Sequence, residues 1–295
     1  MQAATKGFWA IVGACVVWGL SGIYYKALSG VTPLEVLAHR TLWSAVFLGA
    51  IVAVQGQGRA LWAALCGPGL WRLAASALVI SANWFGFIWS VQNGHAVEAS
   101  LGYYIFPLVA VALGMAVFGE KMGRAQGVAV GLAALAVAYL TWALGAAPWM
   151  ALMLALTFGL YGLMKKRLGV APVVSVLAEV VLLSPFAAAL LAARHWGFWG
   201  FAPHSGTFGT ELTQSAMLAF SGVLTGGPLL LFSYAAQRVR MATLGLVQYL
   251  NPTLQFAVAV AVFAEPFTAA HALAFALIWA ALALYSLASL RAAKG

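Results

Sequence analysis

The sequence predicts an all-α integral membrane protein of ten transmembrane helices, arranged as two inverted five-helix repeats with both termini in the cytoplasm. Three observations predict this class: an extremely apolar composition, ten apolar segments of spanning length, and short motifs that recur in both halves. Hydrophobic residues make up 64% of the 295 and charged residues 7%, with a mean hydropathy of +0.97. A soluble domain could not cover its surface with so few charges.

The ten expected spans follow from length alone, because a helix needs roughly 20 apolar residues to cross the hydrocarbon core of a bilayer. The segments that meet this requirement are about 8–28, 34–54, 72–93, 97–118, 124–144, 148–164, 173–193, 214–236, 241–263 and 269–290. The first follows Lys6 as in a signal peptide, but it is long enough to span, so we expect it to be retained.

Basic residues set the orientation of the spans. With the N-terminus inside, every Lys and Arg except Lys26, Arg194 and the intramembrane Arg40 falls on the cytoplasmic side. This bias predicts cytoplasmic termini and accounts for the net charge of +9, so no nucleic acid partner is expected. The expected partners are the lipid bilayer and a small-molecule substrate. Cys15 and Cys66 form no metal or disulfide pattern, and no cofactor is expected.

Internal repeats predict two halves, residues 1–145 and 146–295. GLSG (19–22) recurs as GLYG (159–162), ASLG (99–102) as ATLG (242–245), and FGEKM (118–122) as FAEPF (263–267). Pro107 and Pro252 occupy equivalent places. Because five spans is an odd number, the second half enters the membrane from the opposite side. Inverted halves with interrupted helices are typical of secondary transporters, whose substrate site lies near the midplane.

The motifs HRTLWS (39–44), NWFGFIW (83–89), EASLGYYIFPL (98–108) and TLGLVQYLNPT (243–253) resemble those of the drug/metabolite transporter superfamily. Within it, the chain is similar to the EamA-domain permeases of the chloramphenicol-sensitivity (RarD) type, from about residue 6 to residue 290. The resemblance implies a multi-pass permease of the bacterial inner membrane, often an exporter of small metabolites, and no enzyme.

Arg40 is the first candidate site residue, since it lies about seven residues, or roughly 10 Å, into its span after Pro33. An intramembrane arginine should face a wet cavity or a partner. The offset that relates Pro33 to Pro172 relates Arg40 to Glu179. Two hypotheses remain open: the pair binds the carboxylate and amino group of a zwitterionic substrate, or it forms an ion pair that holds the spans together. His39 and Glu179 are the candidates for proton coupling.

Polar and aromatic residues of other spans are further substrate-binding candidates. Gln248, Asn251 and Gln255 share one face of the ninth span, where amides in contact with lipid would be costly. The remaining candidates, which supply aromatic walls and polar points, are Trp18, Asn83, Tyr103 and Tyr104. Pro107 and Pro252 are hinge candidates, because each removes a helical hydrogen bond.

Small residues four apart predict close helix packing at Gly127 and Gly131 and along Ala272, Ala276 and Ala280. The sequence does not fix the oligomeric state, and a monomer is the working expectation.

The favoured function is alternating-access export of small amphipathic metabolites, amino acids or related zwitterions, with or without H⁺ coupling. One alternative is export of uncharged aromatic compounds or drugs, with Arg40 and Glu179 purely structural. A remote alternative is an intramembrane serine protease, because GLSG matches the GxSG signature with His39 or His271 as base. The recurrence as GLYG favours helix packing over catalysis, since Tyr161 replaces the serine.

Overall fold

The computed structural model describes residues 2–118, 124–144, 148–166, 170–236, 238 and 247–292. Within these ranges the chain folds into helices joined by short connections and contains no strand. The helices are α1 (Gln2–Ala27), α2 (Pro33–Val54), α3 (Gly58–Cys66), α4 (Leu70–Gln92), α5 (Ala96–Phe118), α6 (Arg124–Leu144), α7 (Trp149–Lys166), α8 (Pro172–Trp196), α9 (Leu212–Ala236), α11 (Leu250–Ala261) and α12 (Ala269–Ala292). The predicted join of the two halves and the motif ATLG (242–245) lie outside the described residues.

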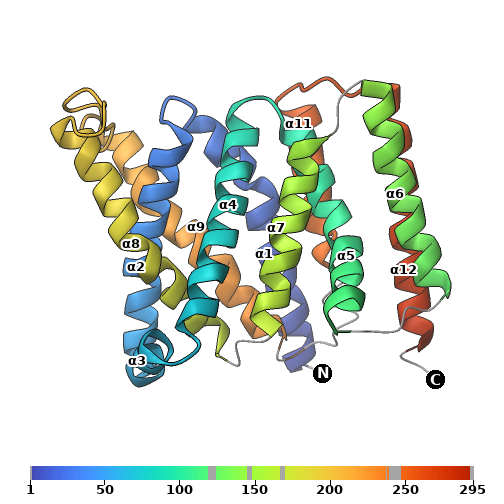
Figure 1. The fold of residues 1–295 in the computed structure, drawn as a ribbon, viewed down its shortest axis with the longest axis horizontal. Helices are drawn as coiled ribbons and strands as arrows, with labels where there is room; N and C mark the ends of the chain where they lie inside the picture. The colour runs from blue at the N-terminus through green and yellow to red at the C-terminus, as the bar shows by residue number, and fades with distance from the viewer. Residues whose placement is uncertain are drawn as a thin grey trace.

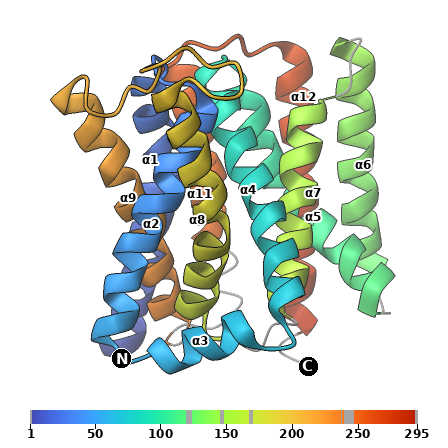
Figure 2. The same ribbon diagram turned by 60° about the vertical axis from the view of Figure 1, so that its left-hand side comes forward.

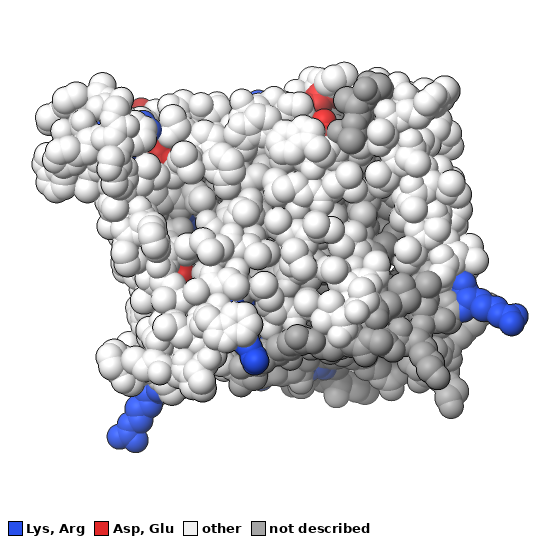
Figure 3. All heavy atoms as spheres, in the orientation of Figure 1, with Lys and Arg blue, Asp and Glu red and all other residues white. Residues whose placement is uncertain are grey.

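Five of these helices, α1, α2, α4, α8 and α9, are long and apolar enough to cross a membrane over the part of the chain that the structure describes. Shorter apolar stretches occur in α6, α7, α11 and α12. An all-helical, multi-pass architecture is therefore confirmed, whereas the count of ten spans stays a prediction. Both chain termini lie at the same end of the bundle (Figure 1). On the face shown in Figure 3, exposed basic side chains protrude toward that end.

Helix α3 lies between the predicted spans 34–54 and 72–93, where no helix was expected. It lies across the end of the bundle (Figure 2) and buries none of its residues. Trp62 is 71% exposed and Cys66 is exposed as well. An apolar helix in this position is typical of a segment that rests in the membrane interface.

Prolines start two of the equivalent helices. Pro33 and Pro172 each occupy the first turn of their helix, α2 and α8, where a missing N–H is tolerated and φ is already helical. Helix α8 ends at Gly197, whose φ of +77° places it in the left-handed region that favours glycine. These signals explain why the predicted and observed bounds of α2 and α8 begin within one residue of each other.

The helix contacts follow the pattern expected of two related halves. Helix α1 packs on α9 and α11, and its counterpart α7 packs on α4 and α5. Helix α2 packs on α8, α5 on α11 and α6 on α12, so each of these helices contacts its own counterpart. This set of contacts maps onto itself when the halves are exchanged. The division into residues 1–145 and 146–295 stays a prediction that these contacts favour.

The glycines of the repeated GLxG motif lie at these equivalent contacts. A Cβ at Gly19 would lie 2.6 Å from the Cβ of Leu254 on α11, and a Cβ at Gly159 would lie 3.1 Å from side-chain atoms of Val109 on α5. Ser21 Oγ donates a hydrogen bond to its own helix, at the carbonyl of Trp18 (2.7 Å). The packing interpretation of the motif is therefore confirmed for both leading glycines.

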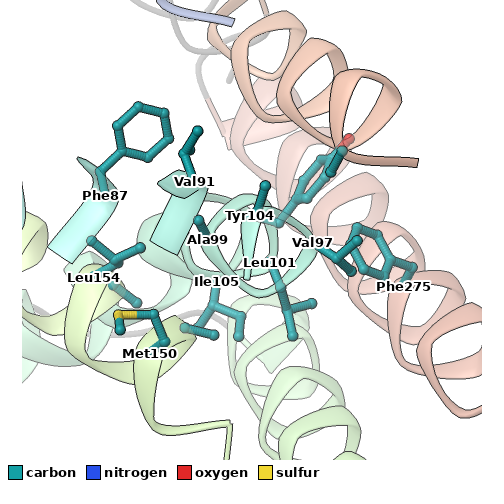
Figure 4. Packing of buried hydrophobic residues seen from close by; sticks show 14 of the residues in the cluster. Phe87, Val91, Val97, Ala99, Leu101, Tyr104, Ile105, Met150, Leu154 and Phe275 are labelled. Atoms are coloured by element: carbon teal, nitrogen blue, oxygen red, sulfur yellow. The ribbon is translucent and has the colours of Figure 1, made fainter. Parts of the chain in front are cut away.

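The largest apolar cluster of the described residues lies mainly among α4, α5, α6, α7 and α12. Ile105 of α5 extends toward Met150 and Leu154 of α7, while the ring of Tyr104 contacts that of Phe275 of α12 (Figure 4). Side chains of α5 thus contact both halves of the chain. This core holds α5 in place beside the candidate site described below.

The small-residue stripes at Gly131 and along Ala272, Ala276 and Ala280 do not pack against another helix of the same chain. A Cβ at Gly131 would meet open space, and Ala272, Ala276 and Ala280 are exposed. The buried faces of the two helices carry other residues instead, namely Ala129, Ala133, Ala136 and Leu140 of α6 and Ala274, Ile278 and Ala281 of α12. Packing of the small-residue faces between two chains stays a prediction.

Candidate functional site

Arg40 lies inside the bundle in contact with two other helices. Its side chain is 7% exposed, Nη1 donates to the Tyr25 hydroxyl of α1 (2.9 Å), and Cζ lies 4.3 Å from the ring centroid of Trp84 on α4. Among the described residues, no carboxylate comes within ion-pair distance of the guanidinium. Its Nε has no hydrogen-bond partner. The guanidinium therefore has donors available to an anionic group.

Ring contacts extend from the Arg40 region toward α5 and α7. Tyr25 contacts Phe87 with ring centroids 6.0 Å apart, Phe87 contacts Tyr103 at 5.9 Å, and Tyr103 contacts Phe158 at 5.7 Å. These side chains come from α1, α4, α5 and α7. They form an aromatic wall that continues inward from Arg40.

Asn83 joins this wall through hydrogen bonds. Its Oδ1 accepts from the Tyr103 hydroxyl (3.0 Å), and its Nδ2 donates to the Leu154 carbonyl (3.0 Å) and the Thr157 hydroxyl (2.9 Å). The predicted residues Asn83 and Tyr103 are thus brought together next to the aromatic wall. Asn83 uses its polar atoms within the protein, so its first role here is to fix α4, α5 and α7 relative to one another.

Glu179 is not paired with Arg40, which corrects the ion-pair hypothesis. The Glu179 carboxylate is fully buried and binds Lys165 Nζ (2.6 Å), the Ser76 hydroxyl (2.6 Å) and the Tyr161 hydroxyl (3.2 Å). These partners come from α7 and α4. The two charges therefore have separate surroundings, and among the described residues only the glutamate has a partner of opposite charge.

Lys165 is the site residue that sequence reasoning missed, because it was assigned to the cytoplasmic end of its span. The repeat contained the signal: the offset of 140 from Gly19 to Gly159 also leads from Tyr25 to Lys165. Tyr25 binds the charge of α2, and Lys165 binds the charge of α8. Each half therefore uses the same repeat position to hold its buried charge.

The amide face of α11 lies against α1. Gln255 Nε2 donates to Asn251 Oδ1 (3.1 Å), which confirms that these two residues share a face. A Cβ at Gly19 would approach the Asn251 carbonyl to 3.1 Å, so the face meets the neighbouring helix. The Gln255 Oε1 is buried without a partner, and Gln248 is half-buried. Among the described residues, the hydrogen bonds of these amides do not involve Arg40.

Two predicted residues lie elsewhere in the bundle. The Tyr104 hydroxyl lies 2.6 Å from the Thr253 hydroxyl of α11, on the side of α5 facing away from Tyr103. Trp18 packs beside α9, with its ring 6.1 Å from that of Phe232. Adjacent tyrosines point in different directions because successive residues of a helix differ by about 100°. These two residues are not brought to Arg40.

The hinge candidates lie within helices, and their motion is untested. Pro252 is buried in α11, while the side chain of Pro107 lies outside the described residues. Helices α8 and α9 contain internal prolines as well, Pro185 and Pro228.

A second buried charge cluster fastens the connection between α8 and α9 to α2. Glu35 is fully buried and accepts from the Thr207 amide (2.6 Å) and hydroxyl (2.8 Å), and Arg194 lies 3.2 Å from its other oxygen. His39 stacks on Phe208 of the same connection, with centroids 4.8 Å apart, and its Nε2 has no partner. This cluster was not predicted, because nothing in the sequence indicates that segments about 170 residues apart meet.

Comparison with known proteins identifies similar sequences. The EamA-like transporter family matches residues 5–142. Protein RarD of Streptomyces exfoliatus is 41% identical over 286 residues, 96% of this chain and 88% of that protein. An uncharacterized transporter of Vibrio cholerae is 38% identical over 293 residues, 99% of this chain and 95% of that protein.

A solved structure shares the fold. A protein crystal structure superimposes with a TM-score of 0.62, covering 97% of this chain and 98% of the other, at 19% identity. The fold match alone does not assign a family, whereas the sequence relatives do, because they are similar over nearly the whole chain. The chain belongs to the EamA-like transporter family, as a permease of the RarD type in the drug/metabolite transporter superfamily.

Proposed function

We propose that this permease is a secondary transporter of the bacterial inner membrane that exports small amphipathic metabolites, amino acids or related zwitterions. In this proposal, transport proceeds by alternating access between the two five-helix halves. His39 or Glu179 would carry the coupled proton. The helices would bend at Pro107 and Pro252. The single observation that carries the substrate class is the buried, uncompensated guanidinium of Arg40. Such a charge inside a membrane protein is expected to have a function.

Arg40 is proposed to bind the substrate carboxylate, and the adjoining aromatic wall its apolar part. The guanidinium stacks on Trp84 and is hydrogen-bonded to Tyr25, so its plane is held in place before a ligand arrives. A preorganised, weakly hydrated guanidinium suits bidentate recognition of a carboxylate.

Glu179 is proposed to bind the substrate amino group in exchange for Lys165. In the described arrangement Lys165 already provides the positive charge at this carboxylate. A substrate ammonium group could replace it at the same oxygens, leaving Lys165 to move toward the nearby end of α7. The ion pair would thus represent the substrate-free state of this cluster.

Replacing Arg40 with glutamine should lower zwitterion transport at least about tenfold, because a hydrogen bond to a charged group contributes roughly 1.5–3 kcal/mol. The measurement is uptake of labelled neutral amino acids and other zwitterions by purified protein in liposomes, with and without a pH gradient. The matched control is Arg59→Gln, which removes an exposed arginine from α3.

A second candidate function, export of uncharged aromatic compounds, is favoured by the stacking of Arg40 on Trp84, which would equally serve to hold α2 against α4. In that case Arg40→Gln leaves transport of a folded protein unchanged, and uncharged aromatic compounds are the cargo. Zwitterion transport that persists in the variant therefore removes Arg40 from the substrate site, and loss of folded protein favours the structural role.

Cys66 tests the proposed cytoplasmic location of the termini. It is exposed on α3, at the end of the bundle that carries both termini, while Cys15 is buried in α1. A membrane-impermeant thiol reagent should therefore label Cys66 in inverted inner-membrane vesicles and not in intact spheroplasts. Cys66→Ser should abolish the labelling. Labelling of Cys66 in spheroplasts would reverse the orientation of the bundle.

A further inference from the structure

A cavity of about 740 Å³ lies between α1 and α9, and Arg40 does not line it. Its lining includes Val17 and Leu20 of α1 and Phe220, Leu224 and Leu231 of α9, and it contains no charged residue. Nothing lies within 4 Å of the position that a Cβ would take at Gly227 of α9, and the next residue of the helix is Pro228. The space between the two helices is therefore an apolar groove.

The groove opens toward the surroundings of the bundle. Leu20 is 40% exposed and Phe220 is 53% exposed. Two hydroxyls of its lining are used within the protein: Ser21 donates to the Trp18 carbonyl and Tyr24 to the Met217 carbonyl. An occupant would thus meet mainly hydrocarbon, as an acyl chain of the bilayer requires.

Two basic residues lie beyond one end of the groove. Helices α1 and α9 run antiparallel, since Gly13 is level with Leu231 and Tyr24 is level with Met217. Seven residues from the first of these contacts, toward the end with the termini, stand Lys6 on α1 and Arg238 at the end of α9. For Lys6, seven residues are nearly two turns, about 10 Å, on the face of α1 that carries Gly13. Arg238 follows α9 and its amide donates to the Ala235 carbonyl (2.8 Å), so it lies beside the last turn of α9.

Arg238 contacts the lining of the groove. Its Cζ lies 3.7 Å from the ring centroid of Tyr234, a lining residue, and its Nη1 donates to the Tyr234 carbonyl (3.1 Å). Lys6 and Arg238 are both exposed. The apolar groove therefore ends near two cations, Lys6 and Arg238, at the end of the bundle with the termini. This arrangement complements a molecule that has an acyl chain and an anionic head group.

We propose that the groove between α1 and α9 binds an anionic phospholipid, with an acyl chain along Leu20 and Leu231 and the phosphate between Lys6 and Arg238. Basic residues at a membrane surface attract anionic lipids, and here the groove fixes where the lipid lies. The site is distinct from the proposed transport site, because none of the substrate-binding candidates lines it. A lipid held between α1 and α9 would stabilise the packing of these two helices, which come from different halves.

The test is native mass spectrometry of the full chain released from membranes that contain equal amounts of phosphatidylglycerol and phosphatidylcholine. Phosphatidylglycerol should be retained preferentially. The double variant Lys6→Gln, Arg238→Gln should lower this preference about 25-fold, since each cation near the surface contributes about a fivefold factor. The matched control, Arg59→Gln with Arg72→Gln, removes two exposed cations from the same end of the bundle and should leave the preference unchanged.

A groove-filling variant separates the acyl-chain site from surface charge. Gly227→Phe should release the retained lipid, whereas Leu135→Phe, an exposed position on α6, should not. Equal retention of both lipids by the unmodified protein would overturn the proposal. So would the same loss of preference in the Arg59 and Arg72 control, because the attraction would then come from overall charge. A Gly227→Phe protein that keeps its lipid would exclude the groove as the site.

Discussion

Replacing Glu179 with glutamine should destabilise the protein by about 3 kcal/mol, because removal of one partner from a buried ion pair leaves the other charge uncompensated. The glutamine keeps the shape of the side chain and one of the two oxygens that accept from Ser76 and Tyr161. Its amide nitrogen takes the place of the other oxygen and can donate to the hydroxyl there, so the main change is the loss of charge. Lys165 retains 22% exposure, which favours the lower end of the range for such pairs. The measurement is the free energy of unfolding of the purified protein in detergent, from a denaturant titration.

The double variant Lys165→Met, Glu179→Gln is the control, and it should recover much of the loss because no charge is then left buried. A double variant as unstable as Glu179→Gln alone would show that Lys165 does not compensate Glu179. A second cycle, between Arg40→Gln and Glu179→Gln, should be additive, because these residues share no partner among the described contacts. A coupling energy above about 0.5 kcal/mol would restore the ion pair between α2 and α8.

Gly222→Ala should destabilise the protein by about 2 kcal/mol or more, because helix backbones meet there and overpacking a tight contact is costly. A Cβ at Gly222 of α9 would lie 2.5 Å from the Trp43 carbonyl oxygen and 2.8 Å from the Ser44 amide nitrogen of α2. Backbone atoms cannot rotate away as a flexible side chain can, so α2 and α9 would have to separate. The measurement is the unfolding midpoint of the purified variant in detergent.

Gly227→Ala is the matched control, five residues further along the same helix. Nothing lies within 4 Å of a Cβ at that position. Alanine is a better helix former than glycine by about 1 kcal/mol, so this variant should be as stable as the unmodified protein or more stable. If both variants lose stability equally, the close approach of α2 and α9 is not the cause. The loss would then come from replacing a glycine in α9 at either position.

Particular elements show why the sequence predicted the helices so well. Residues 34–54 and 124–144 were expected as spans, and the structure has helices at Pro33–Val54 and Arg124–Leu144. Apolar length, proline at the first turn and glycine after the last turn act within one helix, so they can be recognised in consecutive residues. Helix α3 was missed because its nine residues are too short for a length criterion, even though RALWAALC is a sound helical sequence.

The candidate site shows where this kind of reasoning stops. The sequence picked out Arg40 and Glu179 as buried charges, and both are buried. Their partners were not found, because the repeat relates positions of equal depth in two halves and says nothing about which faces meet. Lys165 reaches Glu179 from the end of its own span, a contact that depends on the rotation and tilt of α7 against α8. Asn251 and Tyr104 failed to reach Arg40 for the same reason.

The sequence by itself determined the class of the protein, its family and the residues that are costly to bury. These follow from composition, from motifs and from the high free energy of a charge in hydrocarbon, none of which depends on a neighbour. Only the tertiary structure decided which charges are compensated and which are not. It leaves Arg40 with a tyrosine hydroxyl and an indole ring, gives Glu179 a lysine, and opens a groove beside Gly227. Such outcomes depend on side chains from distant segments meeting within a few ångströms, and that is fixed by how whole helices pack.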